Sequence, residues 1–362
     1  MCHTNITRED ALTERLFQGT IHTLELFGVY LGKRLGLYRS LAERGAQTPL
    51  ELAESAGIAV RYAREWLEQQ AVADFLVVDT LVGDADARRY TLPEAHRGVL
   101  AEDGHAAHVA PFAEMLVGIA GALPRVVDAY RSGEGVDYTH YGSDFRVGQA
   151  GINRPAFSTD LAGPWLAALP DIEARLRTST SARVADVGCG EGWSTIALAR
   201  AYPDAEVIGY DLDTPSIEAA RRNAAEAGVD VAFVCGDAAE LTSDRPFDLI
   251  LLLEALHDMS RPTEALRALR GVLASDGALL VADERVAKAF VAPGDEVERM
   301  MYGWSVSHCL PVAMADTPTA AIGTAIRPEI VERCARDAGF AGARVLPIDN
   351  DLFRFYRLDH AA

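Results

Sequence analysis

Two histidines far apart in the chain carry the side chains best suited to proton transfer or metal binding. His257 is followed by Asp258 and comes just after the apolar run 247–253, and His308 lies in the segment Ser307-His-Cys-Leu-Pro311. A histidine accepts a proton from a substrate oxygen or carbon near neutral pH. Two histidines with a carboxylate nearby can instead hold a divalent or ferric ion that keeps open positions. These residues alone leave both chemistries open.

A glycine-rich turn predicts the ligand site that these groups would serve. The apolar run 183–187 predicts a buried parallel strand, Gly188-Cys-Gly-Glu-Gly192 ends it, and residues 193–202 have helical spacing. Such a strand, turn and helix form a nucleotide-type site, because glycine adopts positive φ and lets a ligand approach the backbone. The G-x-G-x-G spacing is shorter than the pyrophosphate-binding G-x-G-x-x-G, and no G-x-x-x-x-G-K-[ST] occurs. The turn therefore disfavours a dinucleotide and phosphoryl transfer.

Further apolar runs that end in polar residues predict an open α/β sheet. They cover residues 205–212, 231–236, 247–253 and 277–283. Open α/β sheets bind ligands at the carboxyl ends of their strands. Asp211 ends the first of these runs, about twenty residues after the glycine turn, where an acid accepts hydrogen bonds from ribose hydroxyls. The pattern predicts a nucleoside-containing ligand above this edge of the sheet.

At this point the chain resembles the class I S-adenosylmethionine-dependent methyltransferases, over roughly residues 155–358. Residues 184–192 match their first motif, Asp211 their ribose acid and Asp237 their adenine contact. The resemblance implies a Rossmann-like α/β sheet that binds S-adenosyl-L-methionine. It assigns cofactor binding to the glycine turn, to these acids and to neighbouring strand ends: Asp186, Gly188, Gly190, Gly192, Asp211, Leu212, Asp237, Ala238 and Glu254.

Residues 1–104 predict a helical winged-helix domain. Thr48, Pro49 and Glu51 form a helix start with a capping box, and a second helix follows at about residues 60–74. Two short strands around Gly83 complete the pattern of helix–turn–helix and hairpin. The resemblance implies a dimerisation domain that helps to close the partner's site.

A winged helix also raises the possibility of DNA binding. Its second helix carries Arg61 and Arg64 together with Glu65, Glu68 and Asp74. Residues 1–110 hold 11 Lys and Arg against 16 Asp and Glu. Because a DNA-binding domain needs a basic face, this balance argues against nucleic acid as a partner.

Residues 105–180 predict connecting helices that line a substrate pocket, and residues 181–362 the catalytic domain. Tyr138, Tyr141 and Phe145 are expected to roof the pocket. Arg146 and Arg154 are the nearest candidates to hold a substrate carboxylate, since guanidinium pairs with it bidentately. The long connection 285–326, which contains His308, predicts a functional lid, because long connections in compact domains are usually functional.

The two histidine segments resemble one branch of winged-helix methyltransferases, whose members methylate the β-carbon of 2-oxo acids with a metal. That resemblance implies that His257 and His308 hold one iron or zinc ion and that Asp258 supports them or acts as base. A metal chelated by the 2-oxo and carboxylate oxygens stabilises the enediolate as a Lewis acid. Metal-assisted C-methylation of a 2-oxo acid is therefore the main prediction.

Two alternatives remain open. The first is a metal-free O-methyltransferase of a phenol or other hydroxyl compound of natural-product biosynthesis, with His257 as general base. The second is a regulator that binds S-adenosylmethionine and, through the winged helix, DNA. Chelator sensitivity separates C-methylation from O-methylation, and the acidic first domain argues against the regulator.

Composition narrows the setting of the reaction. The chain has 362 residues, a formal charge of −19 and five cysteines without a C-x-x-C pair. Such a chain repels phosphate backbones and anionic membranes, and scattered cysteines suit a reducing cytoplasm. Neither a signal-peptide pattern nor an apolar run of ~20 residues occurs. The predictions are a cytoplasmic enzyme, no membrane, a small-molecule substrate and a homodimer.

Overall fold

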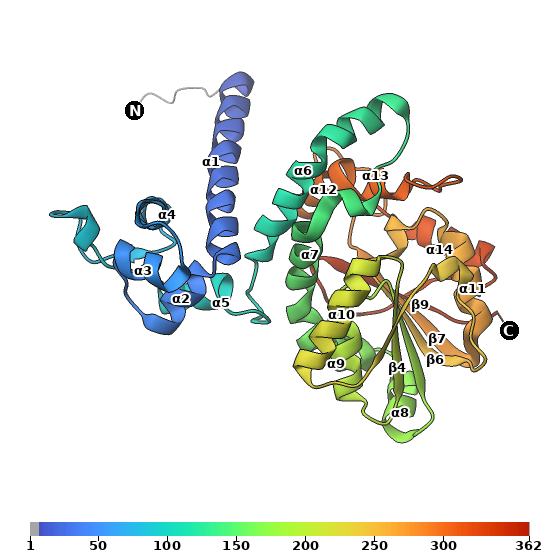
Figure 1. Ribbon diagram of the computed structural model, residues 1–362. Helices are drawn as coiled ribbons and strands as arrows, with labels where there is room; N and C mark the ends of the chain where they lie inside the picture. The colour runs from blue at the N-terminus through green and yellow to red at the C-terminus, as the bar shows by residue number, and fades with distance from the viewer. Residues whose placement is uncertain (1–6, 362) are drawn as a thin grey trace. The chain divides into compact units, whose positions relative to one another are not determined.

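One seven-stranded sheet organises the second half of the chain, in the order β5-β4-β3-β6-β7-β9-β8 (Figure 1). The computed structural model describes residues 7–361, so Cys2 lies outside the described residues. The strands are β3 Arg183–Val187, β4 Glu206–Asp211, β5 Ala232–Cys235, β6 Phe247–Leu253, β7 Leu273–Glu284, β8 Arg344–Val345 and β9 Phe353–Leu358. The first five in this order run parallel, and β9 runs antiparallel to both of its neighbours, β7 and β8. This arrangement confirms the predicted Rossmann-like sheet.

Helices cover both faces of this sheet, which explains why its central strands are apolar throughout. All five residues of β3 and six of the seven in β6 are buried. One apolar cluster joins the sheet to α11 Pro262–Val272 and α14 Pro328–Asp337. A second cluster joins it to α8 Pro170–Thr178, α9 Trp193–Ala201 and the π-helical segment η3 Phe157–Trp165.

The strand register brings the predicted ligand-binding segments to one edge. Val187, the last residue of β3, pairs with Tyr210 of β4 on one side and with Leu252 of β6 on the other. Three segments therefore begin side by side: the glycine turn, the residues after β4 and the residues after β6. Helix α10, Thr214–Ala227, follows β4 with Asp213 as its N-cap.

The insert after β7 returns across this edge. It contains α12 Glu296–Trp304, a π-helical turn η6 Ser305–Cys309 and α13 Leu310–Ala313. The Val136 amide donates to the Pro311 carbonyl at 2.8 Å, and the Ala320 amide donates to the Ser260 carbonyl at 2.8 Å. The insert is thus fastened both to the segment before η2 Tyr138–Tyr141 and to the loop after β6. Helix α7, Gly142–Ala156, follows η2.

The first unit has the predicted winged-helix elements. They are α1 Arg8–Arg34, α2 Leu37–Arg44, α3 Pro49–Ala56, α4 Val60–Val72, β1 Val77–Val78, η1 Ala85–Ala87, β2 Tyr90–Thr91 and α5 Glu94–Leu100. The predicted capping box at Thr48 is formed, since the Glu51 amide donates to its hydroxyl and the Glu51 carboxylate accepts from its amide. The chain divides after Val117, which is later than the predicted boundary at 104, and helix α6, Pro111–Ser132, spans this division.

Both arginines of α4 pair with acidic residues of the same unit. Arg61 pairs with Glu65, and Arg64 lies 3.2 Å from Asp86 and 3.8 Å from Glu68. These pairs neutralise the charge of both arginines, and the absence of a nucleic-acid partner stays a prediction. Within residues 7–361, no helix combines the length and the apolar character that crossing a bilayer demands.

Candidate active site

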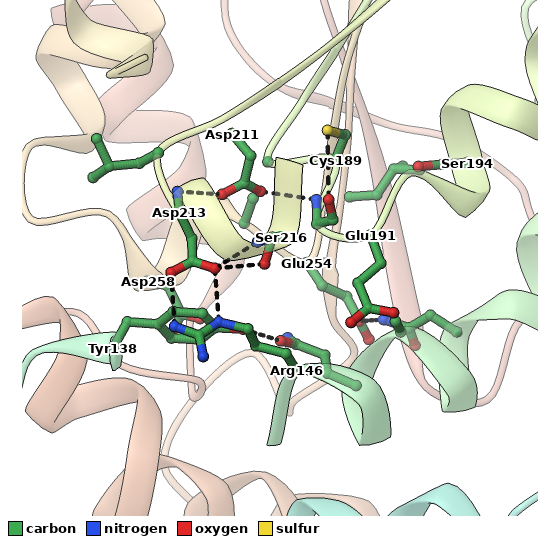
Figure 2. A pocket seen from close by; sticks show the side chains of 18 of the residues that line it. Tyr138, Arg146, Cys189, Glu191, Ser194, Asp211, Asp213, Ser216, Glu254 and Asp258 are labelled. Atoms are coloured by element: carbon green, nitrogen blue, oxygen red, sulfur yellow. Dashed lines mark hydrogen bonds and ion pairs between the residues drawn. The ribbon is translucent and has the colours of Figure 1, made fainter. Parts of the chain in front are cut away.

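A cavity of about 340 Å³ lies at the carboxyl edge of the sheet (Figure 2), and a second of about 240 Å³ lies beside it. We call them the first and second lobe. Tyr138, Gly188, Asp211, Asp258 and Val312 border both lobes, so the two share a wall. The cavity is thus lined by residues of the glycine turn, the strand ends, the connecting segment and the insert.

The glycine turn has the backbone that its sequence predicts. Gly188, Gly190 and Gly192 have φ values of 76°, 52° and 83°, in the left-handed region that favours glycine. A Cβ on Gly188 would lie 2.7 Å from Ala255. Gly188 and Gly190 face the first lobe, whereas Gly192 packs against Phe233 and borders neither lobe.

Asp186 supports the turn from beneath. Its carboxylate accepts hydrogen bonds of 2.6 Å from both Ser194 and Thr195, and the side chain is 1% exposed. It borders neither lobe. The structure therefore gives Asp186 a positioning role, and its contact with the cofactor stays a prediction.

Asp211 is held by two backbone amides. Its Oδ2 atom accepts from the Gly190 amide and its Oδ1 atom from the Asp213 amide, each at 2.8 Å. Burial raises the pKa of this carboxyl group. Asp211 and Leu212 border both lobes, while Asp237 and Ala238 border the second. The predicted ribose and adenine positions therefore border two adjacent lobes.

His257 lies between two carboxylates. It belongs to η5, Leu256–Asp258, and its side chain is only 4% exposed. Its Nδ1 atom is 2.6 Å from Oδ1 of Asp283, and its Nε2 atom is 3.3 Å from Oδ1 of Asp258. Burial opposes a charge on the ring, but the two carboxylates outweigh burial and raise the pKa of His257.

The sequence identified His257 and Asp258 but missed Asp283. Asp283 is fully buried in β7, and its carboxylate contacts the Nδ1 side of the imidazole ring. Asp258 borders both lobes, whereas His257 borders neither. The only sequence pattern that pointed to Asp283 was its position at the end of a predicted strand. The predicted His257–Asp258 pair is in fact part of a three-residue group.

His308 sits in an aromatic enclosure on the insert. Its ring stacks on Phe145 with centroids 3.9 Å apart, and the ring of Tyr141 is 4.5 Å away. Its Nδ1 atom is 3.3 Å from Sγ of Cys309. Burial, followed by repulsion from His257, lowers the pKa of His308 to about 3. His308 is therefore neutral at physiological pH.

Two groups of side chains in residues 7–361 are close enough to share one ion. They are His257 with Asp258 and Cys309, and His257 with Asp283 and Glu284. His308 belongs to neither group, and the Asp283 carboxylate already occupies Nδ1 of His257. Neither group combines His257 with His308. Binding of one ion by these two histidines therefore stays a prediction.

Both predicted substrate arginines already contact other residues of the chain. Arg146 borders the first lobe but donates to both oxygens of Asp213, at 2.7 and 2.8 Å (Figure 2). Arg154 lies over the ring of Trp193, 3.7 Å from its centroid, and borders neither lobe. These arginines were predicted as substrate contacts from residue type alone, and residue type does not reveal which side chains they contact.

The aromatic candidates divide into two sets. Tyr138 borders both lobes as predicted, whereas Tyr141 and Phe145 pack against His308 away from them. Phe157 and Val312, which the sequence did not single out, complete the apolar wall of the first lobe. No local sequence pattern marks these two residues as pocket residues.

Glu254, predicted as a cofactor contact, borders the first lobe and has unusual surroundings. Its φ of 51° is in the left-handed region, which costs energy for a residue with a side chain. Its carboxyl group accepts a hydrogen bond from Asn153, a residue the sequence did not single out. Burial raises the pKa of Glu254 to about 7.

Two family models match the chain. Residues 178–338 match a methyltransferase domain, and residues 25–102 match an Rv2258c-like winged HTH domain. A trans-aconitate 2-methyltransferase from Methylobacterium radiotolerans is 40% identical over 96 residues, 26% of this chain and 35% of that protein. A malonyl-[acyl-carrier protein] O-methyltransferase from Halalkalibacterium halodurans is 30% identical over 101 residues, 27% of this chain and 37% of that protein. The chain thus spans little more than a third of these curated relatives.

Solved structures match over the whole chain at lower identity. Human N-acetylserotonin methyltransferase in complex with SAM is 16% identical, with a TM-score of 0.68 and coverage of 100% of both chains. The O-methyltransferase NcsB1 from neocarzinostatin biosynthesis, solved with S-adenosyl-L-homocysteine and 1,4-dihydroxy-2-naphthoic acid, is 19% identical, with a TM-score of 0.60 and coverage of 93% of this chain and 96% of that one. The mitomycin 7-O-methyltransferase MmcR is 20% identical, with a TM-score of 0.63 and coverage of 98% and 99%. These matches establish a shared fold.

Proposed function

We propose that this chain, which belongs to the winged-helix class I S-adenosylmethionine-dependent methyltransferases, methylates a hydroxyl oxygen of a small molecule. The observation that carries the proposal is the cavity in which the glycine turn and Asp211 face the carboxylate of Asp258. A site for a nucleoside and a proton acceptor thus share one space. The reaction needs these two components and correct alignment.

The residues around the turn fit S-adenosylmethionine. Asp211 is fixed by the Gly190 and Asp213 amides, so its remaining acceptor positions suit ribose hydroxyls. Asp237 and Ala238 line the second lobe, where the adenine contact is expected. When bound, the cofactor supplies an electrophilic methyl group on a sulfonium.

The group of His257, Asp258 and Asp283 takes up the acceptor's proton. With the cofactor bound, the acceptor oxygen would bond to the methyl carbon and the sulfur would keep both electrons of the carbon–sulfur bond. The hydroxyl proton passes to Asp258, which faces the cavity, and His257 with Asp283 stabilises the group from behind. General-base assistance of this kind contributes about 10²–10⁴-fold in rate.

O-methylation has more support than the predicted C-methylation of a 2-oxo acid. A 2-oxo acid needs a cation for its carboxylate, but Arg146 is paired with Asp213. Neither of the two groups of side chains that lie close enough to share an ion combines His257 with His308. Mitomycin 7-O-methyltransferase and NcsB1 share the fold, and NcsB1 was solved with 1,4-dihydroxy-2-naphthoic acid, which favours a hydroxylated aromatic acceptor here.

We also infer that the chain acts as a homodimer, as its winged-helix domain suggests. Helix α1 and its C-cap Leu35 carry an apolar stripe that is exposed: Leu12, Leu16, Leu24, Phe27, Leu31 and Leu35. These residues recur at helical spacing on one face, and a stripe of this size normally marks an interface. A Leu16→Glu, Leu24→Glu double variant is expected to sediment as a monomer while the wild type sediments as a dimer. A wild-type monomer contradicts the inference.

The direct test of the proposed function is methyl transfer from methyl-labelled S-adenosylmethionine to a panel of phenols and aliphatic alcohols. We expect an O-methyl product, identified by the chemical shift of the labelled carbon, without added metal and in the presence of chelator. Transfer to the β-carbon of 2-oxo acids, with loss of activity in chelator, supports the C-methylation reading and rejects this one.

A further inference from the structure

One face of helix α7 forms a wall of the first lobe. The residues that border the lobe recur at helical spacing: Arg146, Gln149, Ala150 and Asn153, with Phe157 at the start of η3. The sequence predicted this segment as a connecting helix beside a substrate pocket. Two of its side chains contact the loops that carry the cofactor motifs, so the helix has a second task.

Arg146 contacts the loop after β4. Its Nε and Nη2 atoms donate to the two oxygens of Asp213, at 2.7 and 2.8 Å (Figure 2). The two side chains are only 10% and 9% exposed. The backbone amide of Asp213 in turn donates to Asp211, the predicted ribose acid, at 2.8 Å. Arg146 is therefore linked to the ribose position through one residue, by a paired contact that fixes both distance and orientation.

Asn153 contacts the residue after β6. Its Nδ2 atom donates to Oε2 of Glu254, which borders the first lobe and has a φ of 51°. A residue with a side chain is strained in this region, so neighbouring contacts must hold it there. The next residue of α7, Arg154, lies over the ring of Trp193, which begins α9 after the glycine turn. Helix α7 thus contacts all three segments that the cofactor motifs occupy at this edge.

The spacing of these contacts along α7 matches the spacing of the strands. Strand β3 lies between β4 and β6, so the loops after β4 and β6 are two strand intervals apart, roughly 10 Å. Arg146 and Asn153 are seven positions apart in the chain, which is close to two helical turns and about 10.5 Å along the axis. The two side chains therefore project from nearly the same face of α7 at the separation of the loops that they contact.

We propose that Arg146 and Asn153 are positioning residues of the cofactor site, which hold the loops after β4 and β6 at the separation that S-adenosylmethionine spans. This inference rests on the cofactor of the proposed function and applies to O- and C-methylation alike. Asp211 borders both lobes, whereas Glu254 borders the first and not the second, where the adenine contact is expected. Arg146 should therefore act on the nucleoside part of the cofactor and Asn153 on the amino-acid part.

The test measures the dissociation constants of two ligands by calorimetry. S-adenosyl-L-homocysteine has both parts of the cofactor, whereas 5′-methylthioadenosine lacks the amino-acid part. Arg146→Met leaves Asp213 unpaired, and we expect it to raise the Kd of both ligands about tenfold. Asn153→Leu should raise the Kd of S-adenosyl-L-homocysteine about tenfold and that of 5′-methylthioadenosine less than about twofold. Weakening of both ligands alike by Asn153→Leu indicates a general loss of structure and overturns the role of Asn153.

A double-mutant cycle shows whether Arg146 acts through Asp213. Asp213→Asn keeps a good N-cap for α10 and removes the charge that Arg146 contacts. Because both single variants weaken the same contact, the double variant should bind S-adenosyl-L-homocysteine within about threefold of either one. Arg146→Lys keeps the charge without the paired geometry and should fall between the wild type and Arg146→Met. Single effects that multiply in the double variant overturn the role of Arg146.

Arg357→Met is the matched control. Arg357 makes the same kind of paired contact, at 2.6 Å to each oxygen of Asp171, and joins β9 to α8 outside both lobes. This variant should lower the melting temperature and leave both dissociation constants unchanged. Folded Arg146→Met and Asn153→Leu variants that bind both ligands like the wild type overturn the inference and retain the proposed function. A wild type that binds neither ligand rejects both.

Discussion

The Nδ1 atom of His257 lies 2.6 Å from Oδ1 of Asp283, a carboxylate on the neighbouring strand β7. Asp283 is fully buried, so this contact fixes the orientation of the ring within the core. The Asp283→Asn variant removes the charge that stabilises the imidazolium. We expect kcat to fall about 100-fold with little change in KM or in affinity for S-adenosyl-L-homocysteine.

Steady-state kinetics across a pH series measure this effect, with the exposed Asp128→Asn variant as control. A structural role alone would lower the melting temperature and leave the pH profile in place. An unchanged kcat in a folded Asp283→Asn variant contradicts the assignment.

Asp211 connects the glycine turn to the start of α10. Replacing it by Ala removes the acceptor of the Gly190 and Asp213 amides together with the predicted ribose contact. We expect the dissociation constant of S-adenosyl-L-homocysteine to rise about 10- to 100-fold, as for the loss of charge-assisted hydrogen bonds. Calorimetry measures it. Thr214→Ala, next to the same loop but outside both lobes, should bind the cofactor like the wild type.

Glu254 makes the stability of the ligand-free protein depend on pH. Burial raises its pKa from 4.5 to about 7, so the folded state holds the proton more tightly than the unfolded state. Its contribution to stability is complete below the unfolded value and is lost as pH rises through the folded value. Glu254→Gln stays neutral, so relative to wild type it should gain on the order of 2 kcal/mol in free energy of unfolding between about pH 5 and about pH 8.

Urea unfolding at both pH values measures this gain. Glu226→Gln, an exposed residue on α10, is the matched control and should show no such difference. A Glu254→Gln variant that follows the wild type at both pH values would show that Glu254 is ionised in the folded protein.

Metal content separates the two methyl-transfer chemistries. His308 stacks on Phe145 and belongs to neither group of side chains that lie close enough to share an ion. We therefore expect elemental mass spectrometry to find no stoichiometric iron or zinc in the wild type or in His308→Ala. About one ion per chain in the wild type, lost in the variant, would favour the metal-assisted C-methyltransferase.

Gly135 controls how closely the insert approaches the connecting segment. A Cβ at this position would overlap the backbone of Met314 and Ala315. Gly135→Ala must displace the insert, which should cost about 1–3 kcal/mol, as overpacking does elsewhere. Gly121→Ala on α6, where a Cβ meets no atom within 4 Å, should instead be neutral or gain up to about 1 kcal/mol. Urea unfolding of the two variants gives the comparison.

Features set by neighbouring residues were predictable from the sequence. The apolar run 183–187 and the three glycines after it dictate a strand and a turn locally, and the structure has both. Thr48 and Glu51 likewise specify a helix start within four residues. In each case the residues that determine the local structure lie within a few positions of one another in the chain.

Features that depend on distant partners could not be predicted. Arg146 pairs with Asp213, 67 residues away, and residue type alone suggested that it was available for a substrate. His257 faces Asp283 because β6 and β7 pair side by side, a register that the sequence does not specify. The acids were predicted from their type and their position after a strand, but which of them face the cavity depends on how the strands are ordered.

The π-helical turn Ser305–Cys309 has a consequence for how this site can change over time. A π-helical turn contains one residue more than the α-helical turn it replaces, and α12 and α13 continue the helix on either side. Deleting one residue there would restore an α-helical turn and keep the helix beyond it in the same rotational phase, because the wider turn already accommodates the extra residue. The side chains of the turn itself, His308 among them, would take new directions, so one codon separates two positions of His308 relative to Phe145.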